Sequence, residues 1–122
     1  MIRLNDLPHD AALSAIDEGE FPAQITGGAN VAVIMTQSWC ADWIRMRVWL
    51  RELAAAGQPS GPDIDVYVLT YNKTGFRSQF LRHKEEVFGN ALIPYVRYYR
   101  NGVCTGDSNQ IGQEEFLSRF AV

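Results

Sequence analysis

Two segments that contain apolar runs, separated by a long amphipathic segment, dominate the pattern of the chain. Val31–Thr36 and Asp63–Thr70 each contain a run rich in β-branched residues, which is typical of buried strands. Between them, Cys40–Ala56 repeats its apolar positions at helical spacing, and this predicts an amphipathic helix. The positions on its apolar face are Trp43, Met46, Trp49, Leu50, Leu53 and Ala54. Because a strand–helix–strand unit requires parallel strands, this part of the chain predicts a parallel pair.

Shorter patterns complete the predicted architecture. The dipeptide Asn101-Gly102 stands between two apolar runs, Tyr95–Arg100 and Val103–Thr105, and is the strongest short signal for a hairpin. Further helices are predicted over Asp10–Glu18, Phe76–Phe88 and Gln113–Phe120, with loops over Phe21–Asn30, Gly57–Pro62 and Asn72–Gly75. This order predicts a three-layer α/β fold, in which helices cover both faces of a central mixed β-sheet. We expect residues 1–122 to form a single domain.

Composition narrows the classes of function. The chain has 122 residues, of which 47% are hydrophobic and 20% are charged, the balance of an ordinary globular domain. Eleven Lys and Arg against fourteen Asp and Glu give a formal net charge of −3, so the usual driving force for nucleic-acid binding is missing. The sequence shows neither a long apolar run nor a signal-peptide pattern. We therefore expect no membrane association and a cytoplasmic location.

The cysteines and histidines do not form a metal-binding pattern. The chain has two of each, Cys40 and Cys104 together with His9 and His83. Two cysteines are too few for a disulfide framework, and these four residues lack the spacing of metal ligands. We expect no metal and no cofactor, and we expect both histidines to be solvated at the surface.

Two further groups of residues have less specific interpretations. The predicted helix over 76–88 carries a run of charges, and its members are Arg77, Arg82, His83, Lys84, Glu85 and Glu86. Charges of both signs on one helix predict an exposed face with ion pairs rather than an anion site. Three tyrosines follow along the next strand, and we expect some in the core and some at the surface; they are Tyr95, Tyr98 and Tyr99.

Three motifs, in order along the chain, resemble the thioredoxin family. An apolar strand leads into Trp39-Cys40-Ala41-Asp42-Trp43, where the family has Trp-Cys-x-x-Cys at the start of a helix. Ile93-Pro94 is similar to the family's cis-proline loop and is followed by a strand and Asn-Gly, and Gly112 matches a glycine before the last helix. The resemblance covers most of the chain. It implies a thioredoxin-like fold, a cis Pro94 beside Cys40 and an exposed Trp39.

The chain departs from this family at two positions that serve dithiol chemistry. Trp43 stands where the family has its second cysteine, which makes the motif Cys-x-x-Trp, and Ile34 stands where the family has a buried acid. Cys104 follows the Asn-Gly turn, at the far end of its strand and about 20 Å from Cys40, since each strand residue adds roughly 3.3 Å. We therefore expect that Cys104 does not resolve a disulfide of Cys40 and is an ordinary buried strand cysteine.

The predicted helix start gives Cys40 a distinctive environment. Free backbone amides and the helix dipole favour a thiolate there. Arg47 and Arg51 add weak positive potential, whereas the carboxylate of Asp42 opposes it. Trp43 has two interpretations: an indole that packs the core in place of the lost thiol, or an edge that lines the groove beside the sulfur.

Two functions from different classes fit these observations. In the first, Cys40 forms a mixed disulfide with a protein, a peptide or a small thiol, and an external thiol releases the product. In the second, the domain is a redox-inactive binding module. Trp39, Ile93, Pro94 and Tyr95 would then form an apolar surface that binds an extended peptide. Specific glutathione use and peroxidase chemistry have less support, since the sequence lacks the basic residue, paired glycines and threonine typical of those families.

Overall fold

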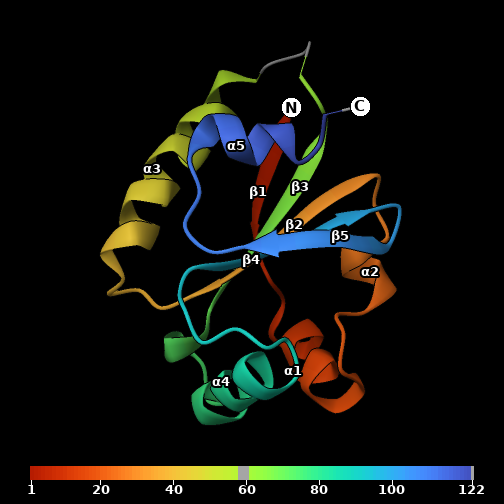
Figure 1. Cartoon of the computed structure of the whole chain (residues 1–122), viewed down its shortest axis with the longest axis vertical. Coiled ribbons are helices and arrows are strands. Elements are labelled where there is room, and N and C mark those ends of the chain that lie inside the picture. The colour runs from red at the N-terminus through yellow and green to blue at the C-terminus, as the bar shows by residue number, and fades with distance from the viewer. Residues whose placement is uncertain (58–60, 122) are drawn as a thin grey trace.

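Five strands form one mixed sheet in the computed structural model, which describes residues 1–57 and 61–121. The strands are β1 (Ile2–Asp6), β2 (Asn30–Thr36), β3 (Ile64–Thr70), β4 (Tyr95–Arg100) and β5 (Val103–Ser108). Their order across the sheet is β1–β3–β2–β4–β5 (Figure 1). β3 pairs in parallel with both β1 and β2, whereas β4 pairs antiparallel with β2 and β5. The predicted mixed sheet is confirmed.

Helices cover both faces of this sheet, as predicted. They are α1 (His9–Glu18), α2 (Ala23–Thr26), α3 (Ala41–Ala56), α4 (Arg77–Glu86) and α5 (Gln113–Ser118), with a short 3-10 helix η1 (Tyr71–Lys73) after β3. α3 and α5 pack into the core on one face of the sheet, and α1 and α4 pack into the core on the other (Figure 1).

The central strand β2 supplies both of these cores. Ala32 and Ile34 point into the core under α3 and α5, and Val31, Val33 and Met35 point into the core under α1 and α4. Because neighbouring side chains of a strand point to opposite faces, a strand that is covered on both sides needs apolar residues at every position. Burial of β2 on both faces therefore explains the continuous apolar run at Val31–Thr36.

Element boundaries differ from the sequence predictions at several places. The first strand, β1, was not predicted, because only Ile2 and Leu4 are apolar in it and its partner β3 lies about sixty residues further along the chain. Helix α2 lies inside the segment predicted as a loop, α4 ends two residues earlier than expected, and β5 continues three residues further. α3 ends at Ala56 as predicted, while residues 58–60 of the predicted Gly57–Pro62 loop lie outside the described residues.

The prediction of a solvated charged face on α4 is wrong for two residues. Lys84 is fully buried and His83 is only 5% exposed. The chain after α4 folds back over the last helical turn: Phe88 packs against the His83 ring at 4.6 Å, and Lys84 Nζ donates to the Asn90 carbonyl oxygen at 2.9 Å. Burial lowers the pKa of His83. The spacing of charges along the helix could not predict this burial, because it depends on the segment that folds back over the helix.

All three tyrosines of β4 are buried, although only some were expected to be. Tyr98 lies in the core under α3 and α5, and Tyr95 and Tyr99 lie in the opposite core. The hydroxyl groups of the last two accept hydrogen bonds from Arg97, at 3.1 and 2.9 Å. Arg97 also pairs with Glu20 at 2.7 Å. This polar network makes it possible to bury the tyrosines, because their hydroxyl groups keep hydrogen-bond partners.

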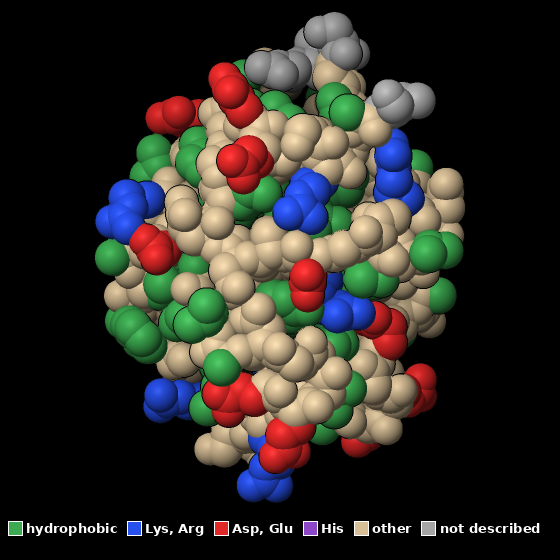
Figure 2. All heavy atoms as spheres, in the orientation of Figure 1, with side chains coloured by type: hydrophobic (Ala, Val, Ile, Leu, Met, Phe, Trp, Pro, Cys, Tyr) green, Lys and Arg blue, Asp and Glu red, His purple; other side chains and the backbone are tan. Residues whose placement is uncertain are grey.

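Cys104 is a strand residue, as predicted, but it is exposed rather than buried. It lies on β5, which is an edge strand of the sheet and has its described side chains mostly exposed. On the molecular face shown in Figure 2, acidic and basic side chains are interspersed with apolar ones. Within the described residues, no helix has both the length and the apolar character needed to cross a bilayer.

We expect the stability of the fold to depend on the buried face of α3. Leu50 is fully buried, so Leu50→Ala should lower the free energy of unfolding by about 2–5 kcal/mol. Val48 lies on the same helix but is 54% exposed, so the matched change Val48→Ala should stay within about 0.5 kcal/mol of wild type. Urea denaturation followed by circular dichroism measures both. Equal losses in the two variants would contradict this assignment of the faces.

Candidate functional site

Cys40 lies where the chain leaves the central strand and enters α3. It is the N-cap residue of this helix, and the carbonyl oxygen of Cys40 accepts from the amide of Ile44 at 3.0 Å. Its Sγ lies 3.8 Å from the carbonyl oxygen of Ile93, which precedes Pro94 across a cis peptide bond. The side chain of Cys40 is 6% exposed. The structure therefore brings together two segments that are more than fifty residues apart, as the sequence motifs predicted.

The loop before Cys40 is held by residues of η1. Gln37 is buried, and its Nε2 donates to the hydroxyl oxygen of Tyr71 at 3.2 Å. The amide of Ser38 donates to Asn72 Oδ1 at 2.9 Å, and Asn72 Nδ2 donates in return to Ser38 Oγ at the same distance. Burial raises the pKa of Tyr71, so this phenol stays protonated. These contacts attach Gln37 and Ser38, which precede Cys40, to Tyr71 and Asn72 of η1.

Trp39 is the most exposed aromatic side chain at this site, with 64% of its surface accessible. Its indole Nε1 donates to Gln37 Oε1 at 3.0 Å, so the ring is tied to the buried Gln37. An exposed indole in one orientation loses little conformational entropy when it packs against a partner. The prediction that Trp39 is exposed is confirmed, whereas its anchor on Gln37 was not foreseen.

The Pro94 loop is held by a pair of asparagines. Asn90 and Asn109 exchange side-chain hydrogen bonds at 3.0 and 2.9 Å, and Asn109 Nδ2 also donates to the carbonyl oxygen of Pro94 at 3.1 Å. The buried amine of Lys84 donates to the carbonyl oxygen of Asn90. Nothing in the local sequence links these residues, because the network joins the end of α4 to the segment after β5.

Apolar side chains occupy both positions that serve dithiol chemistry in the family. Trp43 is 4% exposed and packs in the core under α3 and α5, and Ile34 is fully buried in the same core. Of the two interpretations of Trp43, the structure shows the core-packing one. Cys104, the other cysteine, pairs with Tyr99 in the register of β4 and β5, at the opposite end of β4 from Pro94. Both thiols are free.

The surface next to Cys40 differs from the predicted one. Ile93 is half-buried and Pro94 is buried. Tyr95 is fully buried, and its hydroxyl donates to Asp107 at 2.8 Å, so it packs beneath the loop. The exposed apolar residue of this loop is Leu92, 65% accessible, which the sequence reasoning missed. Its position within an apolar Leu-Ile-Pro stretch gave no sign of which member would point outward.

Charges close to Cys40 are few. The carboxylate of Asp42, which was expected to oppose a thiolate, pairs with Arg45. Arg77 donates to Gln37 Oε1 at 3.4 Å, the same oxygen that accepts from the indole of Trp39. In the described part of the chain, no group of His, Cys, Asp and Glu side chains is arranged to hold a metal ion.

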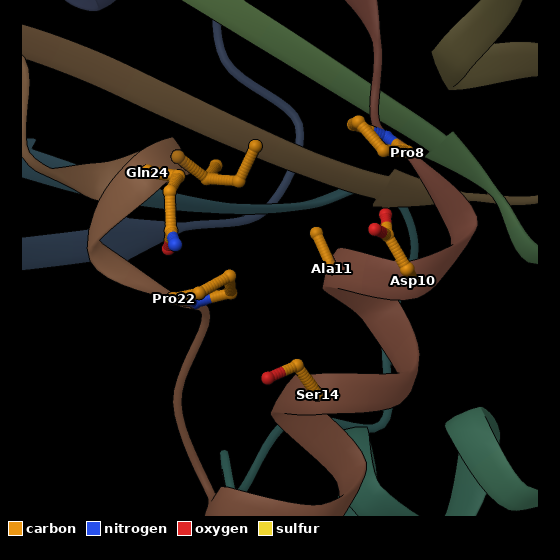
Figure 3. A pocket seen from close by; sticks show the side chains of 7 residues that line it. Pro8, Asp10, Ala11, Ser14, Pro22 and Gln24 are labelled. Atoms are coloured by element: carbon orange, nitrogen blue, oxygen red, sulfur yellow. The ribbon is translucent and has the colours of Figure 1, made fainter.

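A separate hollow of about 360 Å³ lies between α1 and α2 (Figure 3). Pro8 and Pro22 line its walls, and Ser14, Gln24 and Asp10 provide its polar groups. None of these residues belongs to the segments around Cys40. The hollow is therefore a feature apart from the candidate site.

The sheet order, the two helical layers and the meeting of Cys40 with the Pro94 loop define a thioredoxin-like α/β fold. The chain is similar in structure to thioredoxin O1 from Arabidopsis thaliana in its oxidized state, with a TM-score of 0.62 and 13% identity over 97% of this chain and 93% of that one. Thioredoxin f from spinach chloroplast gives a TM-score of 0.61 and 12% identity, covering 97% and 84% of the two chains. Trxlp from Edwardsiella tarda EIB202 gives 0.57 and 21%, covering 97% of each chain.

Sequence comparisons add nothing to this structural result. A scan against protein-family models gives no match, and a comparison with curated proteins gives none either. At such low identities, the similarity to thioredoxins establishes the fold. The roles of individual residues must be argued from this chain itself.

We expect the buried Lys84 to make the free energy of unfolding depend on pH. Burial lowers the pKa of Lys84 from 10.5 to about 8. Between these two values the folded state holds fewer protons than the unfolded state, so the free energy of unfolding rises with pH, by at most about 1.4 kcal/mol per pH unit. Lys84→Met removes this term. The stability of wild type relative to Lys84→Met should therefore increase from pH 8 to pH 10.

Urea denaturation of both proteins across this pH range makes the comparison. Lys73→Met, at an exposed lysine, is the matched control and should run parallel to wild type. Parallel curves for Lys84→Met and wild type would show that Lys84 keeps an ordinary pKa in the folded state.

Proposed function

We propose that this chain is a monothiol thioredoxin-fold protein, in which Cys40 forms a mixed disulfide with a protein or peptide partner. The observation that carries the proposal is the position of Cys40 Sγ at the N-cap of α3, 3.8 Å from the Ile93 carbonyl of the Pro94 loop. Backbone amides at a helix start stabilise a negative charge on the N-cap side chain. A partner backbone that lies along the Pro94 loop would place its own sulfur next to Cys40.

The proposed exchange conserves electrons without a second cysteine in this chain. The Cys40 thiol gives its proton to solvent, and the thiolate attacks one sulfur of the partner disulfide. A new S–S bond forms to Cys40, the partner S–S bond breaks, and the departing partner thiolate takes up a proton. An external small thiol then attacks the partner sulfur, restores the Cys40 thiolate and leaves the partner in a mixed disulfide with that small thiol. A second equivalent of the small thiol releases the reduced partner and becomes the oxidised product.

A second candidate function is supported by a different observation. Trp39 and Leu92 are 64% and 65% exposed on the two loops that flank Cys40, whereas Cys40 itself is 6% exposed. Tryptophan is enriched among the residues that contribute most to the binding energy of protein interfaces. In this alternative the domain binds a protein or peptide through Trp39 and the Pro94 loop, and no disulfide is exchanged.

Comparison of the two thiols tests whether the fold activates Cys40. In Cys104→Ser, Cys40 is the remaining thiol, and at pH 7 it should form a mixed disulfide with glutathione disulfide about tenfold faster in the folded chain than in urea. Mass spectrometry of acid-quenched samples gives the rate. In the matched control, Cys40→Ser, the exposed Cys104 should react at similar rates in both states. Faster reaction of unfolded than of folded Cys104→Ser would mean that the fold shields Cys40, and monothiol exchange would fail.

A change at Trp39 tests recognition of the partner separately from chemistry. In the Cys104→Ser background, Trp39→Ala should slow the reaction with a flexible disulfide-bridged peptide by about tenfold, as expected for the loss of one central aromatic contact. The rate with glutathione disulfide should stay within about twofold, because the neutral indole of Trp39 contributes no charge that would stabilise the Cys40 thiolate. Equal slowing with both probes would contradict a role in recognition and point to loss of the Gln37 anchor.

Recovery of partners distinguishes the two candidate functions. If Cys40 exchanges disulfides, immobilised wild type should retain partners that are released by dithiothreitol, and Cys40→Ala should not retain them. Equal recovery by wild type and Cys40→Ala in the presence of dithiothreitol, lost in Trp39→Ala, would favour the binding module.

A further inference from the structure

Two adjoining hollows lie at the carboxyl ends of β1 and β3. One has a volume of about 250 Å³ and lies between these strands and α3, and the other, of about 300 Å³, continues over the strand ends toward η1. Both are lined by Asp6, Val68 and Thr70, so they adjoin, and together they are here called the strand-end hollow. The ends of parallel strands are a common place for ligands in open α/β sheets.

Basic side chains surround the strand-end hollow. Arg47 and Arg51 line it from α3, one helical turn apart and therefore on the same side of the helix, and Lys73 lines it from η1. His9 lies at the same end as Lys73. Two elements that are distant in the sequence, α3 and η1, thus place positive charge around the strand-end hollow.

The three cations of the strand-end hollow are Arg47, Arg51 and Lys73. Within residues 1–57 and 61–121, none of the three forms an ion pair with a carboxylate within 4.0 Å. By contrast, Arg3, Arg45 and Arg97 each do. Asp6 is the acid that shares the hollow, and with His9 neutral the four charged groups sum to +3 − 1 = +2. This local excess occurs in a chain whose formal net charge is −3.

We propose that the strand-end hollow binds a small organic phosphate monoester. Such a group carries between about −1.5 and −2 charge at neutral pH, which matches the local excess. Guanidinium groups bind phosphate oxygens with paired hydrogen bonds, and Thr70 supplies a hydroxyl group in the same lining. Trp43, Leu4 and Val68 form an apolar wall for the organic part of the ligand. This site is separate from the proposed thiol exchange, because it uses neither Cys40 nor the Pro94 loop.

Amide NMR shifts of the full chain test the proposal with phenyl phosphate as the probe, at constant ionic strength. We expect saturable shifts at Asn5, Thr70 and Arg47. Arg47→Gln combined with Arg51→Gln should weaken binding at least about tenfold, since charge-assisted hydrogen bonds to phosphate are lost. Asp6→Asn should tighten binding severalfold by removal of the opposing charge. Arg82→Gln, which removes the same charge from exposed α4, should leave the affinity unchanged.

Several results would overturn the proposal. One is a set of NMR shifts that do not saturate with phenyl phosphate. Another is a double variant that binds as tightly as wild type while its melting temperature is unchanged. A third is a loss of affinity in Arg82→Gln equal to that in the double variant. Succinate, a dianion with carboxylates instead of phosphate, is the second probe. Binding of succinate as tight as that of phenyl phosphate would show a general anion site and overturn the assignment to phosphate.

Discussion

The pairing of β2 on both of its edges is the constraint on which the rest of the structure depends. β2 pairs in parallel with β3 and antiparallel with β4, and the register sets Thr36 beside Thr70 and Met35 opposite Tyr95. The end of β2, the end of β3 and the start of β4 therefore meet at one edge of the sheet. Cys40 follows β2, η1 follows β3, and Pro94 precedes β4. The contacts around Cys40 therefore follow from the pairing of these three strands. The apolar run of β2, buried on both faces, holds this strand at the centre of the sheet.

The candidate site combines a thiol at a helix start with an apolar core beneath it. A carboxylate at position 34 or a thiol at position 43 would be a polar group beside the core, whereas Ile34 and Trp43 fill that space with apolar surface. This arrangement stabilises the core and removes the groups that resolve a disulfide within one chain. Cys40 remains at the helix start with its sulfur mostly covered.

Buried polar groups hold the loops on the α4 side of the molecule. The amine of Lys84 is bonded to a backbone carbonyl rather than to a carboxylate, so its charge is poorly compensated and its pKa falls. Arg97 shows the contrasting case, because Glu20 and two tyrosine hydroxyls surround its guanidinium. At the strand-end hollow the cations lie at the surface, where water replaces a partner at little cost. The three settings differ in what surrounds the positive charge: a backbone carbonyl at Lys84, a carboxylate and hydroxyl groups at Arg97, and water at the strand-end hollow.

The sequence by itself determined the order of the main elements, the apolar faces of β2 and α3, and the neighbourhood of Cys40 and Pro94. The first two features are local, since strand and helix periodicity depends on neighbouring residues. The meeting of Cys40 with Pro94 is long-range, and it was expected only because two short motifs resemble those of the thioredoxin family. The sequence did not reveal β1, the burial of His83 and Lys84, or the exposure of Leu92. Only the tertiary structure decided these, because each depends on contacts between segments that are distant in the chain: β1 on its pairing with β3, Lys84 on the returning loop at Asn90, and Leu92 on how the Asn90–Asn109 pair turns that loop. Periodicity in the sequence indicates which face of a helix or strand is apolar. Which other segment of the chain packs on that face depends on long-range contacts.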